Sequence, residues 1–142
     1  MKYLVDLNYT LVENSPQWGE PRITPFSRQI ERETYREWLV DFLRDKYAIL
    51  ITARPIRYKE QTLARIFSQA NWQPQEAYFA EISAPPPEIK EDLLLRYIFP
   101  KHGKNGEDFF GIESNPKTRA MYGKYGILSQ SQADLQKSVN IS

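Results

Sequence analysis

Four polar side chains stand at positions where a folded chain could bring them into one site. Asp6, Thr52 and Glu113 each follow directly after a short apolar run, and Lys90 falls in the first turns of a predicted helix. The carboxyl ends of neighbouring parallel strands meet at one edge of a sheet, so we expect these side chains to converge there. A carboxylate can attack phosphorus, whereas a hydroxyl and an ammonium can hold phosphate oxygens. A divalent cation between the two acids and a phosphate would complete such a site.

The apolar runs and the helical periods alternate along the chain, which predicts the scaffold for this site. Strands are expected at residues 3–5, 47–51, 77–80, 109–112 and 127–128. Amphipathic helices are expected between these strands, from their i, i+3, i+4 apolar spacing. The alternation predicts an α/β fold, a three-layer Rossmann-like parallel sheet with helices on both faces. Residues 13–30 hold three prolines and are expected to form an irregular loop, too short to be a large cap domain.

Length and composition set further bounds. The 142 residues suit a single domain spanning 1–142, with residues 129–142 expected to form a loosely ordered tail. The net charge of +1 gives no overall field that would attract nucleic acid or a membrane. The absence of cysteine excludes disulfides and thiolate chemistry. No run approaches the roughly 20 apolar residues of a membrane span, so we expect a cytoplasmic protein without membrane partners; its oligomeric state stays open.

Four segments together resemble the motifs of the haloacid dehalogenase-like (HAD) superfamily, over about residues 2–128. The stretch from Asp6 to Leu11 resembles its first motif, DxDxT, and the strand ending in Thr52 resembles the second. Lys90 resembles the third motif, and the stretch from Phe110 to Gly126 resembles the acidic fourth motif with its helix. That last stretch is most similar to capless HAD phosphatases, including the phosphatase domains of polynucleotide kinases. The HAD-like fold that the resemblance implies is the parallel sheet described above.

The resemblance implies a role for each matching residue. Asp6 would be the nucleophile of a Mg²⁺-dependent phosphohydrolase and would form an aspartyl-phosphate. Asn8 would give its backbone carbonyl to the Mg²⁺ ion, Thr52 would bind phosphate, and Lys90 would neutralise charge. Glu113 and its neighbour Ser114 would belong to the metal end of the site, with Asp6 and Asn8.

Three further residues are expected on the substrate side of the site. Thr10, Arg54 and Arg57 are candidate substrate contacts, although the cluster around Arg57 could equally be a solvated helix start. The substrate would be a phosphorylated small molecule or a nucleic-acid end, since an uncapped crevice is open. Trp18 could stack on a substrate ring, but an anchor packed within the loop is the preferred interpretation.

Two positions depart from the family pattern. The second aspartate of the first motif, which usually serves as general acid and base, is Asn8, and a carboxamide cannot exchange a proton near neutral pH. The loss of such a group costs about 10²–10⁴-fold in rate. The second acid of the fourth motif is Ser114, a weak ligand for Mg²⁺. Three functions therefore stay open: a slow phosphohydrolase, a catalytically inactive binding or regulatory protein, and a phosphotransferase or non-phosphate hydrolase.

Overall fold

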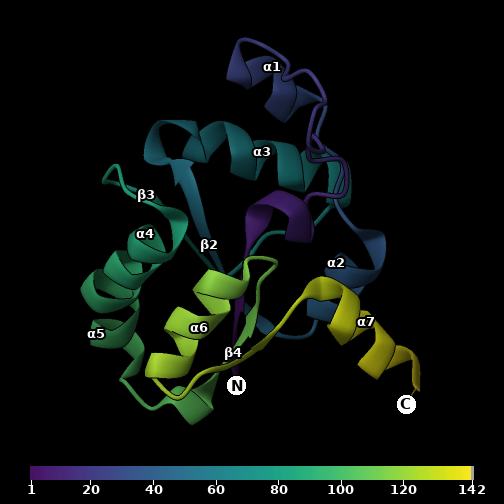
Figure 1. Ribbon diagram of the computed structural model, residues 1–142. Helices are drawn as coiled ribbons and strands as arrows, with labels where there is room; N and C mark the ends of the chain where they lie inside the picture. Colours follow the sequence, from purple (N-terminus) through teal and green to yellow (C-terminus); the bar gives the residue numbers. More distant parts are fainter. Residues whose placement is uncertain (142) are drawn as a thin grey trace.

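The computed structural model describes residues 1–141, which form a sheet of five parallel strands in the order β3-β2-β1-β4-β5 (Figure 1). The strands are β1 (Lys2–Val5), β2 (Tyr47–Pro55), β3 (Glu76–Ala80), β4 (Phe109–Ile112) and β5 (Leu128–Gln130). All five predicted strands are confirmed, and β2 runs four residues beyond its expected end at Ile51. The predicted α/β class with a parallel sheet is therefore confirmed.

The central strand, β1, lies between β2 and β4. Val5 pairs with Leu50 on one side and with Ile112 on the other. Each of these strands is buried on both faces, which explains why they are continuous apolar runs rather than alternating patterns. β1 and β4 end at the same level, and β2 passes this level at Leu50 and continues to Pro55. The residues just beyond this level therefore share one edge of the sheet.

Helices cover both faces of the sheet, each over its own apolar core. One core contains Leu39, Ile66 and Leu135, from α2 (Glu37–Leu43), α3 (Lys59–Ala70) and α7 (Gln132–Ile141). The other contains Ile89, Phe99 and Met121, from α4 (Pro86–Leu93), α5 (Phe99–His102) and α6 (Pro116–Lys124). Two turns, η3 (Leu94–Ile98) and η4 (Gly106–Asp108), complete the connection from α4 to β4. The arrangement is the predicted three-layer one (Figure 1).

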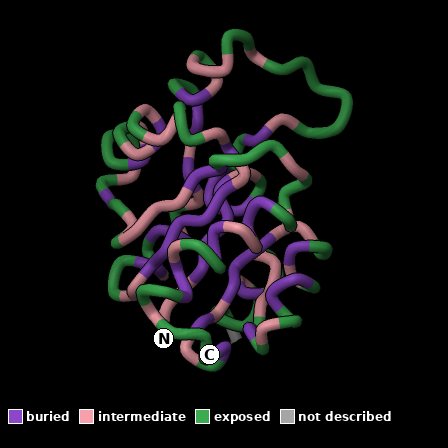
Figure 2. Tube along the Cα trace, turned by 90° about the vertical axis from the view of Figure 1, so that its left-hand side faces the viewer, coloured by how far each residue is buried: buried purple, intermediate pink, exposed green. Residues whose placement is uncertain are grey.

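The segment between β1 and α2 stands beyond the carboxyl edge of the sheet. It leaves β1 through an irregular turn, η1 (Leu7–Leu11), and contains one short helix, α1 (Phe26–Glu31), where only loop was predicted. Asn14 closes the base of this segment, because its side chain donates to Arg32 O (2.8 Å) and accepts from Thr34 N (2.9 Å). Most of the segment is exposed, as the upper part of Figure 2 shows. It is too small for a cap domain, and residues 1–141 contain none elsewhere.

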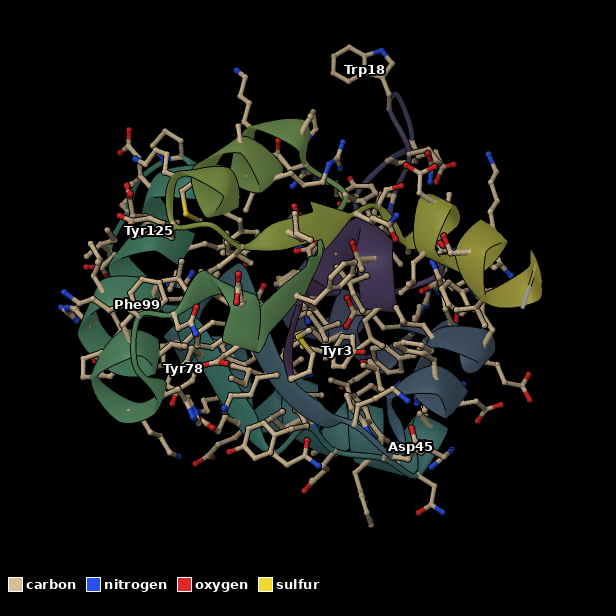
Figure 3. The ribbon with its side chains drawn as sticks, turned by 90° about the horizontal axis from the view of Figure 1, so that it is seen from below. Tyr3, Trp18, Asp45, Tyr78, Phe99 and Tyr125 are labelled. Carbon is tan, nitrogen blue, oxygen red and sulfur yellow. The ribbon has the colours of Figure 1, made fainter. Side chains whose placement is uncertain are left out.

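Two expectations differ from the structure. Residues 129–141, expected to be loosely ordered, form the end of β5 and helix α7, whose Leu135 is 7% exposed in the core; residue 142 lies outside the described part. Trp18, for which a packed anchor was preferred, is fully exposed and points away from the protein (Figure 3). Within residues 1–141, no helix combines the length and the apolar character needed to cross a membrane.

Candidate active site

Asp6 is the centre of a buried polar cluster at the carboxyl edge of the sheet. Its backbone N–H continues the ladder of β1 by donating to Ile112 O (3.0 Å), which fixes its position. Its side chain is nearly buried, and both carboxylate oxygens are held. Lys90 Nζ donates to Oδ1 (2.6 Å), while Thr10 Oγ1 (2.7 Å) and Ser114 Oγ (3.0 Å) both donate to Oδ2. Residues predicted from three of the four motifs, the first, third and fourth, therefore meet around one carboxylate.

Lys90 links this carboxylate to a second one. Pro86 and Pro87 open α4, and the helix carries Lys90 inward from its second turn, where the side chain is buried. Its ammonium forms ion pairs with both Asp6 and Glu113. The other oxygen of Glu113 accepts from the backbone N–H of Asn115 (3.0 Å), at the beginning of α6.

One cation thus faces two carboxylates away from water. Burial opposes ionisation of Asp6, but Lys90 and the hydrogen bonds outweigh it and hold the pKa of Asp6 below its usual range. Burial also opposes the charged form of Lys90, yet the two acids raise its pKa. For Glu113 the balance is opposite: burial and the nearby Asp6 charge raise its pKa to about 7, against the effect of Lys90. We conclude that Asp6 stays ionised and that Glu113 exchanges its proton near neutral pH.

The turn η1 brings Thr10 back over Asp6. The N–H of Leu11 donates to Asp6 O (3.3 Å), which closes the turn around the carboxylate. Tyr9 has a positive φ of 62°, an uncommon conformation for a residue with a side chain. Its N–H donates to Ser15 Oγ (2.8 Å), and this bond from the following loop holds the backbone in that conformation. Such backbone strain is concentrated at functional sites.

Asn8 does not point its acceptor oxygen at Asp6. Arg54 Nη2 donates to Asn8 Oδ1 (2.9 Å), so the amide oxygen is bound to Arg54. Arg54 itself is buried and forms a two-fold ion pair with Glu33, with Nη1–Oε1 at 3.0 Å and Nη2–Oε2 at 2.5 Å. The charge of Arg54 is matched by Glu33, a residue that sequence reasoning missed, and the predicted contact of Arg54 with a substrate stays a prediction. Glu33 lies 21 positions away in a polar stretch, and nothing local signals the pair.

The remaining predicted residues lie near the Asp6 cluster without touching it. Thr52 is buried on β2, beside β1, and its hydroxyl accepts from the backbone N–H of Arg54 (3.0 Å). Arg57 is exposed on the turn η2 (Ile56–Tyr58) and lines a recess next to the cluster. Their proposed contacts with phosphate stay predictions.

The predicted metal ligands do not form a ready-made cation site. Within residues 1–141 no group of three or more His, Cys, Asp or Glu side chains could hold a metal ion. Among the side chains, Glu113 is bound to Lys90 and the amide oxygen of Asn8 to Arg54, whereas the predicted backbone-carbonyl ligand of Asn8 stays a prediction. Asp6 Oδ2 and Ser114 Oγ remain, 3.0 Å apart, close to the roughly 2.9 Å between adjacent oxygens around a Mg²⁺ ion with ligands at 2.0–2.1 Å. Because Mg²⁺ is commonly bound by one or two carboxylates together with substrate phosphates, this pair fits an ion that binds with its phosphate.

Comparisons with known proteins support the fold of the chain. No family model matches the chain, and no curated protein matches it. Among solved structures, a chain of "the Pnkp1/Rnl/Hen1 RNA repair complex" is similar to it with a TM-score of 0.69 and 16% identity, over 92% of this chain and 42% of that one. A chain of a second Pnkp1/Rnl/Hen1 complex gives a TM-score of 0.65 at 16% identity, over 92% and 45% of the two chains. This chain therefore spans less than half the length of either neighbour, and the likeness shows a shared fold.

Proposed function

We propose that this chain is a slow HAD-type phosphohydrolase that acts on phosphorylated nucleic-acid ends, with Asp6 as its nucleophile. The observation that carries the proposal is the geometry around Asp6, where Lys90 and Thr10 clasp an ionised carboxylate at the carboxyl edge of the central strand. The likeness of the fold to chains of an RNA repair complex supports a nucleic-acid-related role.

The residues of the site suit the two halves of such a reaction. An oxygen of Asp6 would form a bond to phosphorus while the bond from phosphorus to the leaving oxygen breaks. The leaving oxygen would take its proton from water. Water would then attack the phosphorus of the aspartyl-phosphate, releasing phosphate and restoring Asp6. Lys90 would neutralise charge in both halves, and the Thr52 hydroxyl would donate to a phosphate oxygen. A Mg²⁺ ion at Asp6 and Ser114 would supply further positive charge against the phosphate.

The rate is expected to be low because residue 8 cannot transfer a proton. An amide in place of the general acid and base typically costs about 10²–10⁴-fold. Arg54 also holds the Asn8 side chain by its oxygen, so the leaving group would depend on solvent for its proton.

The same observation favours a second candidate, a protein that binds phosphorylated ends without turnover. In that case the Asp6 cluster would serve for recognition, and Asn8 and Ser114 would mark the loss of catalysis. The two candidates differ in one measurable property, the release of inorganic phosphate.

The deciding experiment measures phosphate release from a short phosphorylated oligonucleotide with Mg²⁺. The wild type should release phosphate slowly, and Asp6→Asn should abolish release, because an amide cannot form the acyl-phosphate. Asn8→Asp combined with Ser114→Asp should raise the rate by up to about 10²–10⁴-fold. Lys104→Ala, an exposed change on the opposite edge of the sheet, serves as the control and should leave the rate unchanged.

The single changes separate the two defects. A gain from Ser114→Asp alone that shrinks at high Mg²⁺ would identify metal affinity as limiting, and a gain from Asn8→Asp alone would identify proton transfer. Activity that survives Asp6→Asn would refute Asp6 as the nucleophile. If neither the wild type nor the double variant releases phosphate while the oligonucleotide still binds, the binding function is correct.

A further inference from the structure

A recess of about 460 Å³ lies beside the Asp6 cluster, under the exposed segment that precedes α2. Its wall is formed by η1, by the loop from Ser15 to Thr24, by Phe26 and Gln29 of α1, and by the end of β2 with η2. Asn8 and Tyr9 belong to this wall and lie on the turn η1, which directly follows Asp6; Asp6, Lys90 and Glu113 themselves do not line the recess. Its size lies within the range of small-ligand sites, roughly 300–1,000 Å³.

The charge on the wall has one sign. No Asp or Glu lines the recess, and the three charged lining residues are Arg22, Arg54 and Arg57. Glu33, which does not line the recess, neutralises Arg54 through their buried ion pair. Arg22 and Arg57 have no ion-pair partner among residues 1–141 and are exposed. The recess therefore presents two unmatched cations to a ligand, although the protein as a whole is almost neutral.

Aromatic side chains line the same wall as these cations. Tyr9 is 45% exposed in the wall, and its hydroxyl donates to Pro16 O (2.7 Å), which fixes the ring. Tyr58 packs edge to face on Phe26, with ring centres 4.8 Å apart, and the Arg57 guanidinium lies 4.8 Å from the centre of the Tyr58 ring. Aromatic rings that share a wall with unpaired cations are a combination that binds single-stranded nucleic acid.

We propose that this recess binds the nucleotide next to the terminal phosphate of a single-stranded nucleic acid. The base stacks on Tyr9, and the phosphate that links this nucleotide to the rest of the strand lies between Arg22 and Arg57. The proposal rests on the proposed function, because the terminal phosphate is placed at Asp6. It also assigns Arg57 to the linking phosphate rather than to the phosphate that is removed.

The test is the binding of a fluorescein-labelled five-nucleotide single strand, followed by anisotropy at several salt concentrations in EDTA. Each contact with a phosphate of a single strand contributes about −0.7 to the slope of log K against log salt. Arg22→Ala and Arg57→Ala should each weaken binding and make the slope shallower by about that amount. Lys104→Ala removes the same unit charge at the opposite edge of the sheet and should change neither quantity.

The stacking contact has its own pair of variants. Tyr9→Leu should weaken binding by roughly 5- to 150-fold, the range that corresponds to loss of one stacked base, with the salt slope unchanged. Tyr9→Phe loses the bond to Pro16 but keeps the ring, and it should bind within a few-fold of wild type. An equal loss of affinity in Tyr9→Leu and Tyr9→Phe would mean that the aromatic ring does not contribute to binding.

The binding assay needs no turnover, so it gives an answer even if phosphate release is never observed. Slopes unaffected by either arginine change would overturn the proposal. An acidic peptide of equal charge that binds as tightly, and through the same arginines, would also overturn it, because the recess would then recognise charge and not nucleotides.

Discussion

The raised pKa of Glu113 makes a prediction about stability that needs no ligand. Its pKa rises from an ordinary 4.5 to about 7 in the folded protein, chiefly because of burial. Between these two values the unfolded chain has lost this proton and the folded chain has kept it, so the folded state binds more protons. Stability should therefore fall as pH rises from about 4.5 to 7 and level off above 7. Since each pKa unit is worth about 1.4 kcal/mol, this loss is about 3 kcal/mol.

Glu113→Gln removes the titrating group and keeps a similar shape, so it should remove that slope. The assay is urea unfolding at pH 5, 6, 7 and 8 in EDTA, with the unfolding free energy of the variant subtracted from that of the wild type. Asp6 and Glu76 have lowered pKa values, to about 2 for Glu76, and their effects fall below about pH 4.5, outside this window. Wild type and variant that lose stability in parallel from pH 5 to 7 would refute the reasoning, because Glu113 would then be ionised throughout.

Two further predictions concern stability. Glu33→Gln should destabilise the protein by about 3–5 kcal/mol in urea unfolding at pH 7, because it leaves the buried Arg54 charge without its partner. The paired change Glu33→Leu with Arg54→Met should recover part of this loss. Full stability of Glu33→Gln alone would contradict the buried ion pair. Leu135→Ala should lower the free energy of unfolding by about 2 kcal/mol in the same measurement. This value is at the low end for a buried leucine because Leu135 lies on the last helix, α7, which covers part of one face of the sheet. A change below about 0.5 kcal/mol would indicate that α7 does not pack on the sheet.

The fold and the centre of the site were predictable because their signals are local. A buried parallel strand is a continuous apolar run, and the residue after it is placed at the carboxyl edge whatever the rest of the chain does. Asp6 and Glu113 could be placed in this way, and Lys90 followed from the prolines that begin its helix. Their contacts come from the sheet topology, which the alternation of strands and helices already implied.

The surroundings of the site were less predictable, because their interactions join distant and irregular segments. Arg54 contacts Asn8 and Glu33, which are 46 and 21 positions away, and Glu33 lies outside any helix or strand. A charged residue in a polar stretch reads as solvated unless its partner is known. Helix α7 was missed for a related reason: its amphipathic pattern is weak, and the burial of Leu135 depends on the core that the rest of the chain provides.

Asn8 and Ser114, the two residues that depart from the family pattern, both replace an acid and therefore both reduce the negative charge of the site. With carboxylates at both positions, a phosphate dianion would meet four acids and only Lys90, so a tightly bound metal would be needed before any phosphate could approach. In the proposed site a phosphate would instead meet Asp6, Lys90 and a Glu113 whose pKa of about 7 leaves it about half protonated near pH 7. The repulsion between the phosphate and the acids of the site would be smaller, and the affinity of the site for a metal ion would also be smaller. Binding of a phosphorylated end would then depend less on Mg²⁺ and more on the unpaired arginines of the adjacent recess. The oligonucleotide should therefore bind in EDTA, whereas the proposed hydrolysis would require the metal.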